Sequence, residues 1–103
     1  TLRLRLLCDV CKAMKRSEKY LKYGVKLEDR YLIYEEGNRK VAVPYAHIAF
    51  LSVSKNNLVI QTNSMEKVVI KLDTEDTANA LFEDILVFIE RLYIILIERL
   101  YIQ

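Results

Sequence analysis

Residues 24–48 read GVKLEDRYLIYEEGNRKVAVPYAHI, and this stretch decides how the chain folds. Two runs rich in β-branched and aromatic residues flank Glu36-Gly37-Asn38, whose glycine and asparagine accept the positive φ that a tight hairpin turn needs. Pro44 ends the second run, because a proline has no N–H to donate to a central strand. The stretch therefore predicts an antiparallel hairpin that turns a corner at Pro44.

The same alternation of short apolar runs and turn residues continues to residue 72. Polar turns at residues 55–57 and 63–64 separate the later runs, so that a turn recurs about every ten residues, which is typical of a sandwich or a small barrel. The predicted strands are Val25–Glu28, Tyr31–Glu35, Lys40–Val43, Ile48–Ser54, Leu58–Thr62 and Val68–Leu72. The side chains predicted to face inward are Phe50, Leu58, Ile60, Ile70 and Leu72.

The hydrophobic period changes from strand to helix at Asp73-Thr74. Either side chain can cap a helix, and Glu75 and Asp76 suit its positive end, so we predict a helix over residues 75–102. Its apolar residues form two stripes: Ala78, Leu81, Ile85, Phe88, Leu92 and Ile95, and beside them Phe82, Leu86, Ile89, Tyr93, Leu96 and Leu100. The hexapeptide IERLYI occurs at residues 89–94 and again at 97–102, which fits two turns of one helix. The alternative breaks the helix near Arg91 and makes residues 92–97 a strand.

The predicted helix is longer and more apolar than one small domain can cover. It would extend about 42 Å, against about 23 Å for a seven-residue strand. Two stripes also exceed the single stripe of about 100° that a surface helix needs, and monomers avoid exposing such a patch. We therefore expect a homo-oligomer, most simply a dimer, with an interface at Leu92, Tyr93, Ile95, Leu96 and Leu100. The alternative folds the end of the helix back onto its own sheet.

The first 23 residues are expected to form a strand followed by a basic loop. Apolar residues alternate over residues 2–10, as in a half-buried strand, although apolar residues also recur at helical spacing from Leu4 to Met14. The polar segment 12–22 fits a loop or a short helix. At 103 residues the whole chain fits one domain. Residues 85–102 are interrupted by four charges, too many for a membrane span, so we expect no transmembrane segment and a cytoplasmic protein; its peripheral association with a membrane stays open.

Residues 24–85 resemble the pleckstrin-homology-like (PH-like) superfold, in particular GRAM and bacterial PH-like domains. The resemblance is carried by GVKLEDRYLIY at residues 24–34, by VPYAHI at 43–48, and by the paired strands and closing helix that follow. Glu28 stands where those families usually have threonine. The resemblance implies an α+β, mainly β, fold: a small antiparallel barrel or bent sheet closed by a long C-terminal helix. These motifs are a tight turn and a proline corner, so they indicate the fold and contain no catalytic residues.

The chain offers few residues in patterns that carry chemistry. Cys8 and Cys11 could hold zinc only if a second subunit supplied the same pair, because a structural zinc site has four ligands. We expect them to be reduced and metal-free, with that intersubunit site or a redox pair as alternatives. His47, the single histidine, is expected on the surface. With no glycine-rich phosphate loop and no triad motif, we expect no enzyme and no cofactor.

One basic cluster precedes the predicted strands. It consists of Lys12, Lys15, Arg16, Lys19 and Lys22, interleaved with Tyr20 and Tyr23. The resemblance implies that this segment lies between the first two strands, where phosphoinositide-binding PH domains keep their basic residues. A solvated loop would look the same.

From these features we predict a non-catalytic binding or assembly module. It would self-associate through its C-terminal helix and offer the basic cluster to an anionic partner, an acidic lipid headgroup or a protein. The alternative is a small nucleic-acid-binding accessory or viral protein, which would use the same charges and stack bases on the two tyrosines.

Overall fold

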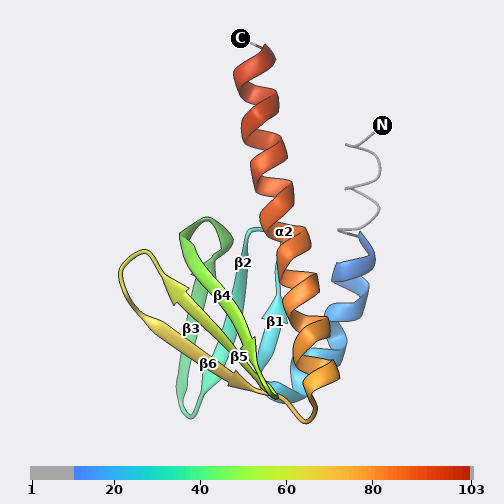
Figure 1. Ribbon diagram of the computed structural model, residues 1–103, viewed down its shortest axis with the longest axis vertical. Coiled ribbons are helices and arrows are strands. Elements are labelled where there is room, and N and C mark those ends of the chain that lie inside the picture. Colours follow the sequence, from blue (N-terminus) through green and yellow to red (C-terminus); the bar gives the residue numbers. More distant parts are fainter. Residues whose placement is uncertain (1–10, 103) are drawn as a thin grey trace.

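The computed structural model describes residues 11–102, with side chains as far as residue 94. Residues 11–16 are α-helical and lead directly into the 3-10 helix η1, Ser17–Tyr23. The strands that follow are β1 Val25–Leu27, β2 Tyr31–Glu36, β3 Arg39–Pro44, β4 Ile48–Ser54, β5 Asn57–Thr62 and β6 Lys67–Lys71. The short 3-10 helix η2, Tyr45–His47, separates β3 from β4, and the helix α2, Glu75–Ile102, ends the described chain (Figure 1). All six predicted strands are therefore present.

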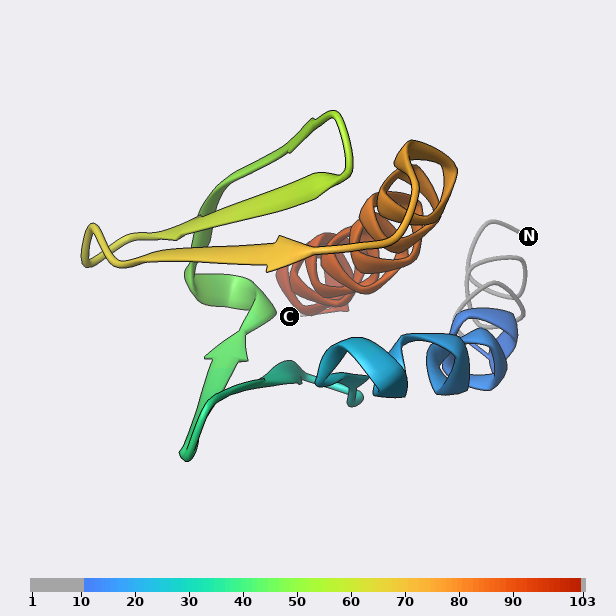
Figure 2. The same cartoon turned by 90° about the horizontal axis from the view of Figure 1, so that it is seen from below.

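The strands form two antiparallel sheets of three strands each, in the orders β1-β2-β3 and β4-β5-β6. Figure 2 shows the two sheets diverging, with α2 between them. The chain passes from one sheet to the other through η2, directly after Pro44 in the edge strand β3. The predicted corner at Pro44 is thus confirmed.

The strands do not close into a barrel, and that alternative of the prediction is wrong. Within residues 11–102 no strand of the first sheet is paired with a strand of the second. The turn at η2 interrupts pairing on one side. The Tyr34 hydroxyl of β2 donates to the Val69 carbonyl of β6 at 3.2 Å, so a side-chain hydrogen bond joins the two sheets. The space between the sheets is filled by α2, as the second alternative, a bent sheet closed by a helix, requires.

The core lies between the inner faces of the two sheets and α2. Leu58, Ile60, Ile70 and Leu72 are buried, as the alternation of their strands predicts. The first stripe of α2 packs against them, since its members Ala78, Leu81, Ile85 and Phe88 have no exposed surface. The Phe88 ring stacks on that of Tyr45 in η2, with centroids 5.0 Å apart. This contact holds α2 against the corner between the sheets.

Phe50 does not belong to this core, and its predicted inward orientation is wrong. Its side chain is 56% exposed. Ile48 pairs with Thr62, but Phe50 pairs with Gln61, so Ala49 is an extra residue in β4. A β-bulge of this kind reverses which side chains face inward beyond it. Phe50 therefore lies on the outer face of the second sheet.

The helix α2 is continuous through residues 91–97, so the alternative of a strand there is wrong. Its first turn is capped by Thr74, whose hydroxyl accepts the Thr77 N–H at 3.1 Å. Its length is about 42 Å at 1.5 Å per residue. Figure 1 shows its second half running past the ends of both sheets. No helix within residues 11–102 has both the length and the hydropathy to cross a membrane.

The basic segment before β1 is helical, where a loop was the main expectation. Gly24 ends η1 at φ 78°, and its N–H donates to the Leu21 carbonyl at 3.0 Å. A Cβ on Gly24 would lie 3.1 Å from the Glu35 carbonyl oxygen in β2, so a glycine is needed at this close approach. The predicted strand over residues 2–10 lies outside the described residues.

Candidate functional site

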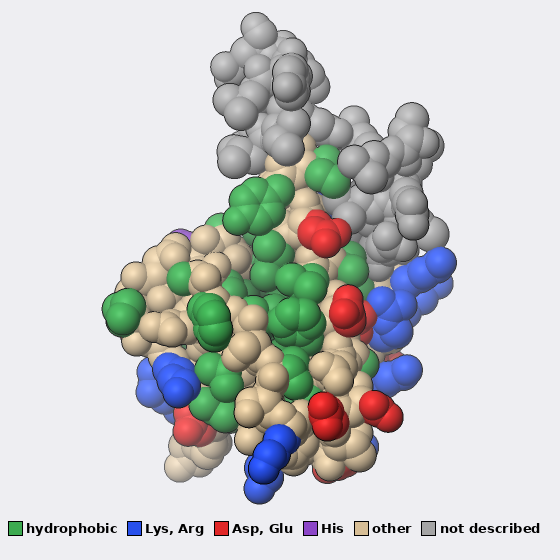
Figure 3. Space-filling view, in the orientation of Figure 1, with side chains coloured by type: hydrophobic (Ala, Val, Ile, Leu, Met, Phe, Trp, Pro, Cys, Tyr) green, Lys and Arg blue, Asp and Glu red, His purple; other side chains and the backbone are tan. Residues whose placement is uncertain are grey.

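The four lysines of the basic cluster lie along one flank of the helical segment that precedes β1. Lys12, Lys15, Lys19 and Lys22 follow a helical spacing and are all exposed. The other side of the segment is anchored in the core by Ala13, which has no exposed surface. Figure 3 shows blue side chains gathered at the right edge of the molecule, on this segment. The cluster is therefore a stripe on a helix, and we refer to these four residues as the lysine stripe.

An open groove of about 800 Å³ separates this segment from the first half of α2. Lys19 and Lys22 line one bank together with Glu18, and Asp76 and Glu83 line the other. An anion inside the groove would meet these carboxylates as well as the ammonium groups, and like charges repel it. The outer flank of the lysine stripe is thus more favourable for an anionic partner than the groove itself.

Arg16 has a structural contact that the sequence did not reveal. Its Nη2 and Nε donate to Oδ1 of Asp84 at 2.7 and 3.1 Å. The Tyr20 hydroxyl donates to the other carboxylate oxygen of Asp84 at 2.7 Å. Asp84 is only 3% exposed, so these donors satisfy a buried charge. Burial, and next the hydrogen bond to Asp84, raise the pKa of Tyr20 well above its usual value. Arg16 thus ties the basic segment to α2, whereas the sequence placed it among the ligand-binding residues.

A signal for this contact is present in the sequence. Asp84 lies three residues after Leu81 and four before Phe88, so it falls on the buried stripe of α2. A carboxylate on a buried stripe requires donors from elsewhere in the fold. The identity of those donors, however, depends on how the basic segment packs.

The four lysines of the stripe differ in whether they already have an ion-pair partner. Lys22 lies 3.5 Å from the Asp73 carboxylate and 5.1 Å from the centroid of the Tyr23 ring. Its contact with Tyr23, and then the charge of Asp73, raise the pKa of Lys22. Among the described residues none pairs with Lys12, Lys15 or Lys19. These three ammonium groups are the ones available to a partner.

The tyrosines in the segment offer little surface for stacking bases. Tyr20 is 2% exposed. Tyr23 is half-buried, and its hydroxyl donates to Asp73 at 2.8 Å. The arrangement that a nucleic-acid-binding function would use is therefore absent at Tyr20.

A second candidate surface follows the second stripe of α2. Phe82, Leu86 and Ile89 are half-buried, and Tyr93 is 65% exposed. Of the predicted interface residues, Leu92 is half-buried, and the side chains of Ile95, Leu96 and Leu100 lie outside the described part of the chain. Figure 3 shows green side chains following α2 upward on this face. The described part of the stripe is thus only partly covered by the rest of the chain.

Arg91, on the same half of α2, forms an ion pair within its own chain. Its guanidinium donates through both terminal nitrogens to the Asp29 carboxylate in the turn between β1 and β2, with Nη2 3.2 Å from Oδ2. The Arg91 side chain is 18% exposed as a result. This ion pair clamps the middle of α2 to the first sheet.

The residues considered for metal or redox chemistry are not gathered into a site. Cys11 is a free thiol on the surface, and Cys8 lies outside the described residues. His47 is exposed in η2. Within residues 11–102 no three His, Cys, Asp or Glu side chains are placed to hold a metal ion together.

Comparisons with known proteins add one likeness. No family model matches the chain, and no curated protein does. Among solved structures, the chain is similar to the solution structure of the N-terminal PH domain of the human ARAP2 protein. The TM-score is 0.53 at 20% identity, over 64% of this chain and 61% of that one, so the match spans less than two thirds of the PH domain structure. At this identity the likeness shows the fold alone: the chain has a PH-like fold, as the resemblance of residues 24–85 implies.

Proposed function

Starting from the PH-like fold, we propose that this chain is a non-catalytic binding and assembly module. It self-associates as a homodimer through α2, and it presents the lysine stripe to an anionic partner. The observation that carries the proposal is the contrast between the two stripes of α2. The first is fully buried from Ala78 to Phe88, and the second is half-buried and ends in the exposed Tyr93.

We infer self-association from the free energy that is lost when the apolar side chains of the second stripe stay exposed to water. The stripe continues along α2 as the helix leaves the sheets (Figure 1). Phe82 and Ile89 pack only partly against the core, and Tyr93 is 65% exposed. Burying a few hundred Å² of apolar surface from each chain offers several kcal/mol, at about 25 cal/mol per Å², before the cost of association. A second copy brings an identical stripe, so two α2 helices can cover one another around a twofold axis.

Sedimentation velocity of the wild type, Tyr93→Glu and Tyr31→Glu tests the dimer. Tyr31 is a matched control, because it is an exposed tyrosine on the first sheet. We expect a dimer at tens of micromolar for the wild type and for Tyr31→Glu. A monomer is expected for Tyr93→Glu, because a carboxylate would be buried in the interface. A monomeric wild type, or a dimeric Tyr93→Glu, contradicts the proposed interface.

Lys12, Lys15 and Lys19 support the second half of the proposal. They are exposed, have no ion-pair partner among the described residues, and repeat along one flank of the helical segment. Near an acidic surface each such charge contributes about 1 kcal/mol. The acidic bank at Asp76 and Glu83 directs the partner to the outer flank of the stripe.

Binding to vesicles and to nucleic acid, each measured over a series of salt concentrations, tests this surface. The variant replaces Lys12, Lys15 and Lys19 by Gln; the control replaces Lys26, Arg39 and Lys40 and loses the same charge elsewhere. We expect binding to acidic vesicles that the first variant loses and the control retains. Tighter binding to single-stranded or duplex nucleic acid, with a steep linear dependence on log salt, would favour the alternative function instead. The burial of Tyr20 argues against that outcome.

A further inference from the structure

The outer face of the second sheet carries an apolar patch that neither proposed surface uses. Because Leu58, Ile60 and Ile70 face the core, their neighbours in β5 and β6 face outward. The register places Phe50, Gln61 and Lys67 in one row across the three strands, and Ser52, Val59 and Val69 in the next. Phe50 is 56% exposed and Val69 46%. The bulge in β4 thus brings a large aromatic ring to this face.

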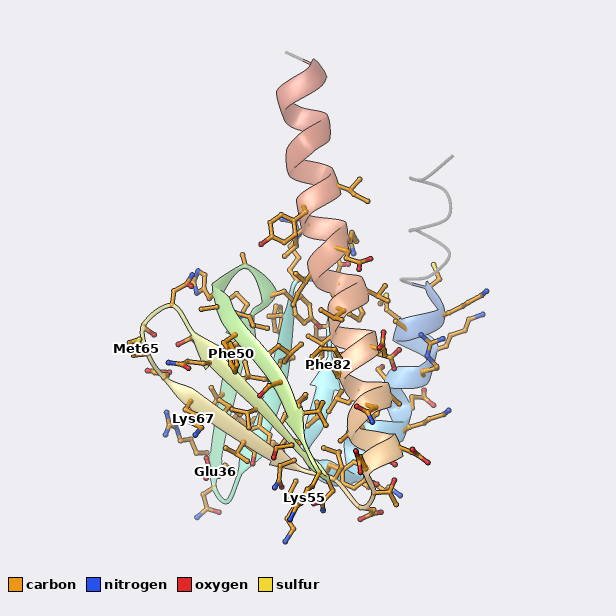
Figure 4. All side chains as sticks on the ribbon, in the orientation of Figure 1. Glu36, Phe50, Lys55, Met65, Lys67 and Phe82 are labelled. Carbon is orange, nitrogen blue, oxygen red and sulfur yellow. The ribbon has the colours of Figure 1, made fainter. Side chains whose placement is uncertain are left out.

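Met65 extends the patch from the turn between β5 and β6. Its Sδ lies 3.7 Å from Nε2 of Gln61, the residue paired with Phe50. Figure 4 labels Met65, Phe50 and Lys67 on the same side of the molecule. The Met65 side chain is 76% exposed, the largest exposed fraction among the large apolar residues of the described chain. Methionine is flexible and polarizable, and such side chains suit adaptable binding surfaces.

The backbone conformation at Met65 is unfavourable for a residue with a side chain. Its φ is 67°, in the left-handed region that favours glycine and asparagine. A bulky residue in that region is strained, and strain of this kind gathers at binding sites. A glycine would hold the same turn without the strain. The position therefore keeps an exposed apolar side chain at the expense of stability.

The charged side chains on the strands of this face have one sign, whereas the turn that carries Met65 also carries Glu66. Lys67 and Lys71 face outward from β6, and Lys55 lies in the turn between β4 and β5. None of the described residues forms an ion pair with these three lysines. The outward-facing residues of the three strands include no Asp or Glu. The strands of this face thus present apolar side chains at the centre and positive charges beside them.

We propose that the outer face of the second sheet docks a protein segment that is acidic and carries apolar side chains. Carboxylates of the partner would pair with Lys67 and Lys71, while its apolar side chains pack on Phe50, Val69 and Met65. The same face of a second copy is a poor occupant, because a twofold contact would oppose lysine with lysine. A membrane is also a poor occupant, because the patch lies on the face of a sheet and its protruding turn carries Glu66 and Asn63 beside Met65.

Selection from a random-peptide phage library against the full chain supplies the probe, with an unrelated protein as the background. We expect the enriched peptides to combine several carboxylates with aromatic or aliphatic residues. Fluorescence polarisation of the best peptide then compares the variants. Phe50→Ser should weaken binding about tenfold, as for a central apolar contact. Lys67→Gln with Lys71→Gln should weaken it and reduce its salt dependence. Tyr31→Ser, an exposed residue on the other sheet, is the matched control and should change nothing.

Met65→Gly separates a binding role from a structural one. Relief of the positive φ should raise the midpoint of urea unfolding, while loss of the side chain weakens peptide binding several-fold. A purely structural position would not show this opposition. Tyr93→Glu should leave peptide binding unchanged, so that the proposed dimer and the proposed peptide-binding surface are tested independently.

Several outcomes overturn the proposal. A library that yields no peptides above the background contradicts it, and so do enriched peptides that lack carboxylates. Peptide binding that Phe50→Ser leaves intact would also contradict the proposal. Phosphatidylcholine vesicles containing phosphatidylserine provide a further test. If Phe50→Ser and Met65→Gly abolish binding to these vesicles, and no peptide binds, the face is assigned to a membrane. Concentration-dependent shifts of the β4–β6 amides in NMR spectra without peptide would assign it to a second copy.

Discussion

The Arg16 guanidinium and the buried Asp84 carboxylate are joined by two hydrogen bonds, although 68 residues separate them in the sequence. The pair links the helical segment before β1 to the first half of α2. The Tyr20 hydroxyl donates to the second oxygen of the same carboxylate, so two residues of the segment bind one buried carboxylate of the helix. The orientation of the lysine stripe depends on this contact, because the stripe is carried by the same segment.

Asp84→Asn is expected to lower the free energy of unfolding by about 1–3 kcal/mol. The substitution removes the charge that Arg16 pairs with and leaves an amide group facing the guanidinium. The Arg16 side chain is 41% exposed and can be resolvated, which limits the loss. Urea unfolding measures the change. Glu83→Gln, on the exposed neighbour, should alter stability by less than about 0.5 kcal/mol, and an equal effect of both substitutions would show that the buried pair contributes nothing particular.

Stability should fall as the pH rises above about 10, the ordinary pKa of tyrosine. Burial raises the pKa of Tyr20, Tyr45 and Tyr34 above that value, so the folded chain keeps protons that the unfolded chain releases. The stabilisation is therefore complete below pH 10 and is lost as the pH rises toward the folded pKa values. Each tyrosine adds a slope of up to about 1.4 kcal/mol per pH unit.

Tyr45→Phe isolates one of these contributions. Its urea unfolding, measured at several pH values between 9 and 11, should show a shallower loss of stability than the wild type, because the proton that Tyr45 retains in the folded chain is gone. At neutral pH the variant should be less stable by about 1 kcal/mol, since the Tyr45 hydroxyl donates to the Glu28 carbonyl at 2.7 Å. Parallel pH profiles for variant and wild type would disprove the linkage.

Gly24→Ala should destabilise the fold more than Gly37→Ala. Both glycines have positive φ, 78° and 60°, so both substitutions carry the strain of a left-handed conformation, about 1 kcal/mol. At Gly24 the added Cβ would also lie 3.1 Å from the Glu35 carbonyl oxygen, whereas at Gly37 nothing lies within 4 Å. The difference between the two thermal unfolding midpoints measures the contact. If Gly37→Ala is the more damaging, the close approach of Gly24 to β2 is not a constraint.

Phe88→Ala and Phe82→Ala should separate the roles of the two stripes of α2. Phe88 is fully buried against Tyr45, so its truncation should cost about 3–5 kcal/mol of stability. Phe82 is half-buried, so its truncation should cost less. At a concentration where both variants are folded, Phe82→Ala should weaken the proposed dimer and Phe88→Ala should not, as measured by sedimentation equilibrium. The reverse pattern would place the interface elsewhere.

The elements of this protein were predictable because their signals are local. The turn at Gly37, the end of β3 at Pro44 and the capped start of α2 at Thr74 each depend on residues within one turn of the chain. The two stripes of α2 follow from its period in the same way. The PH-like fold follows from the order of these elements, which the strands and the long helix confirm.

What only the tertiary structure decided are the features that depend on a distant partner. The orientation of Phe50 depends on how β4 pairs with β5, because one extra residue at Ala49 reverses the face. The role of Arg16 depends on Asp84, which accepts two of its hydrogen bonds. Tyr20, which the alternative nucleic-acid function would use for stacking, is buried beside the same carboxylate. The sequence determined the order of strands and helix through interactions between near neighbours. The exposure of Phe50 was decided by the pairing of two neighbouring strands, and the contacts of Arg16 and Tyr20 by packing between segments more than sixty residues apart, which no local pattern encodes.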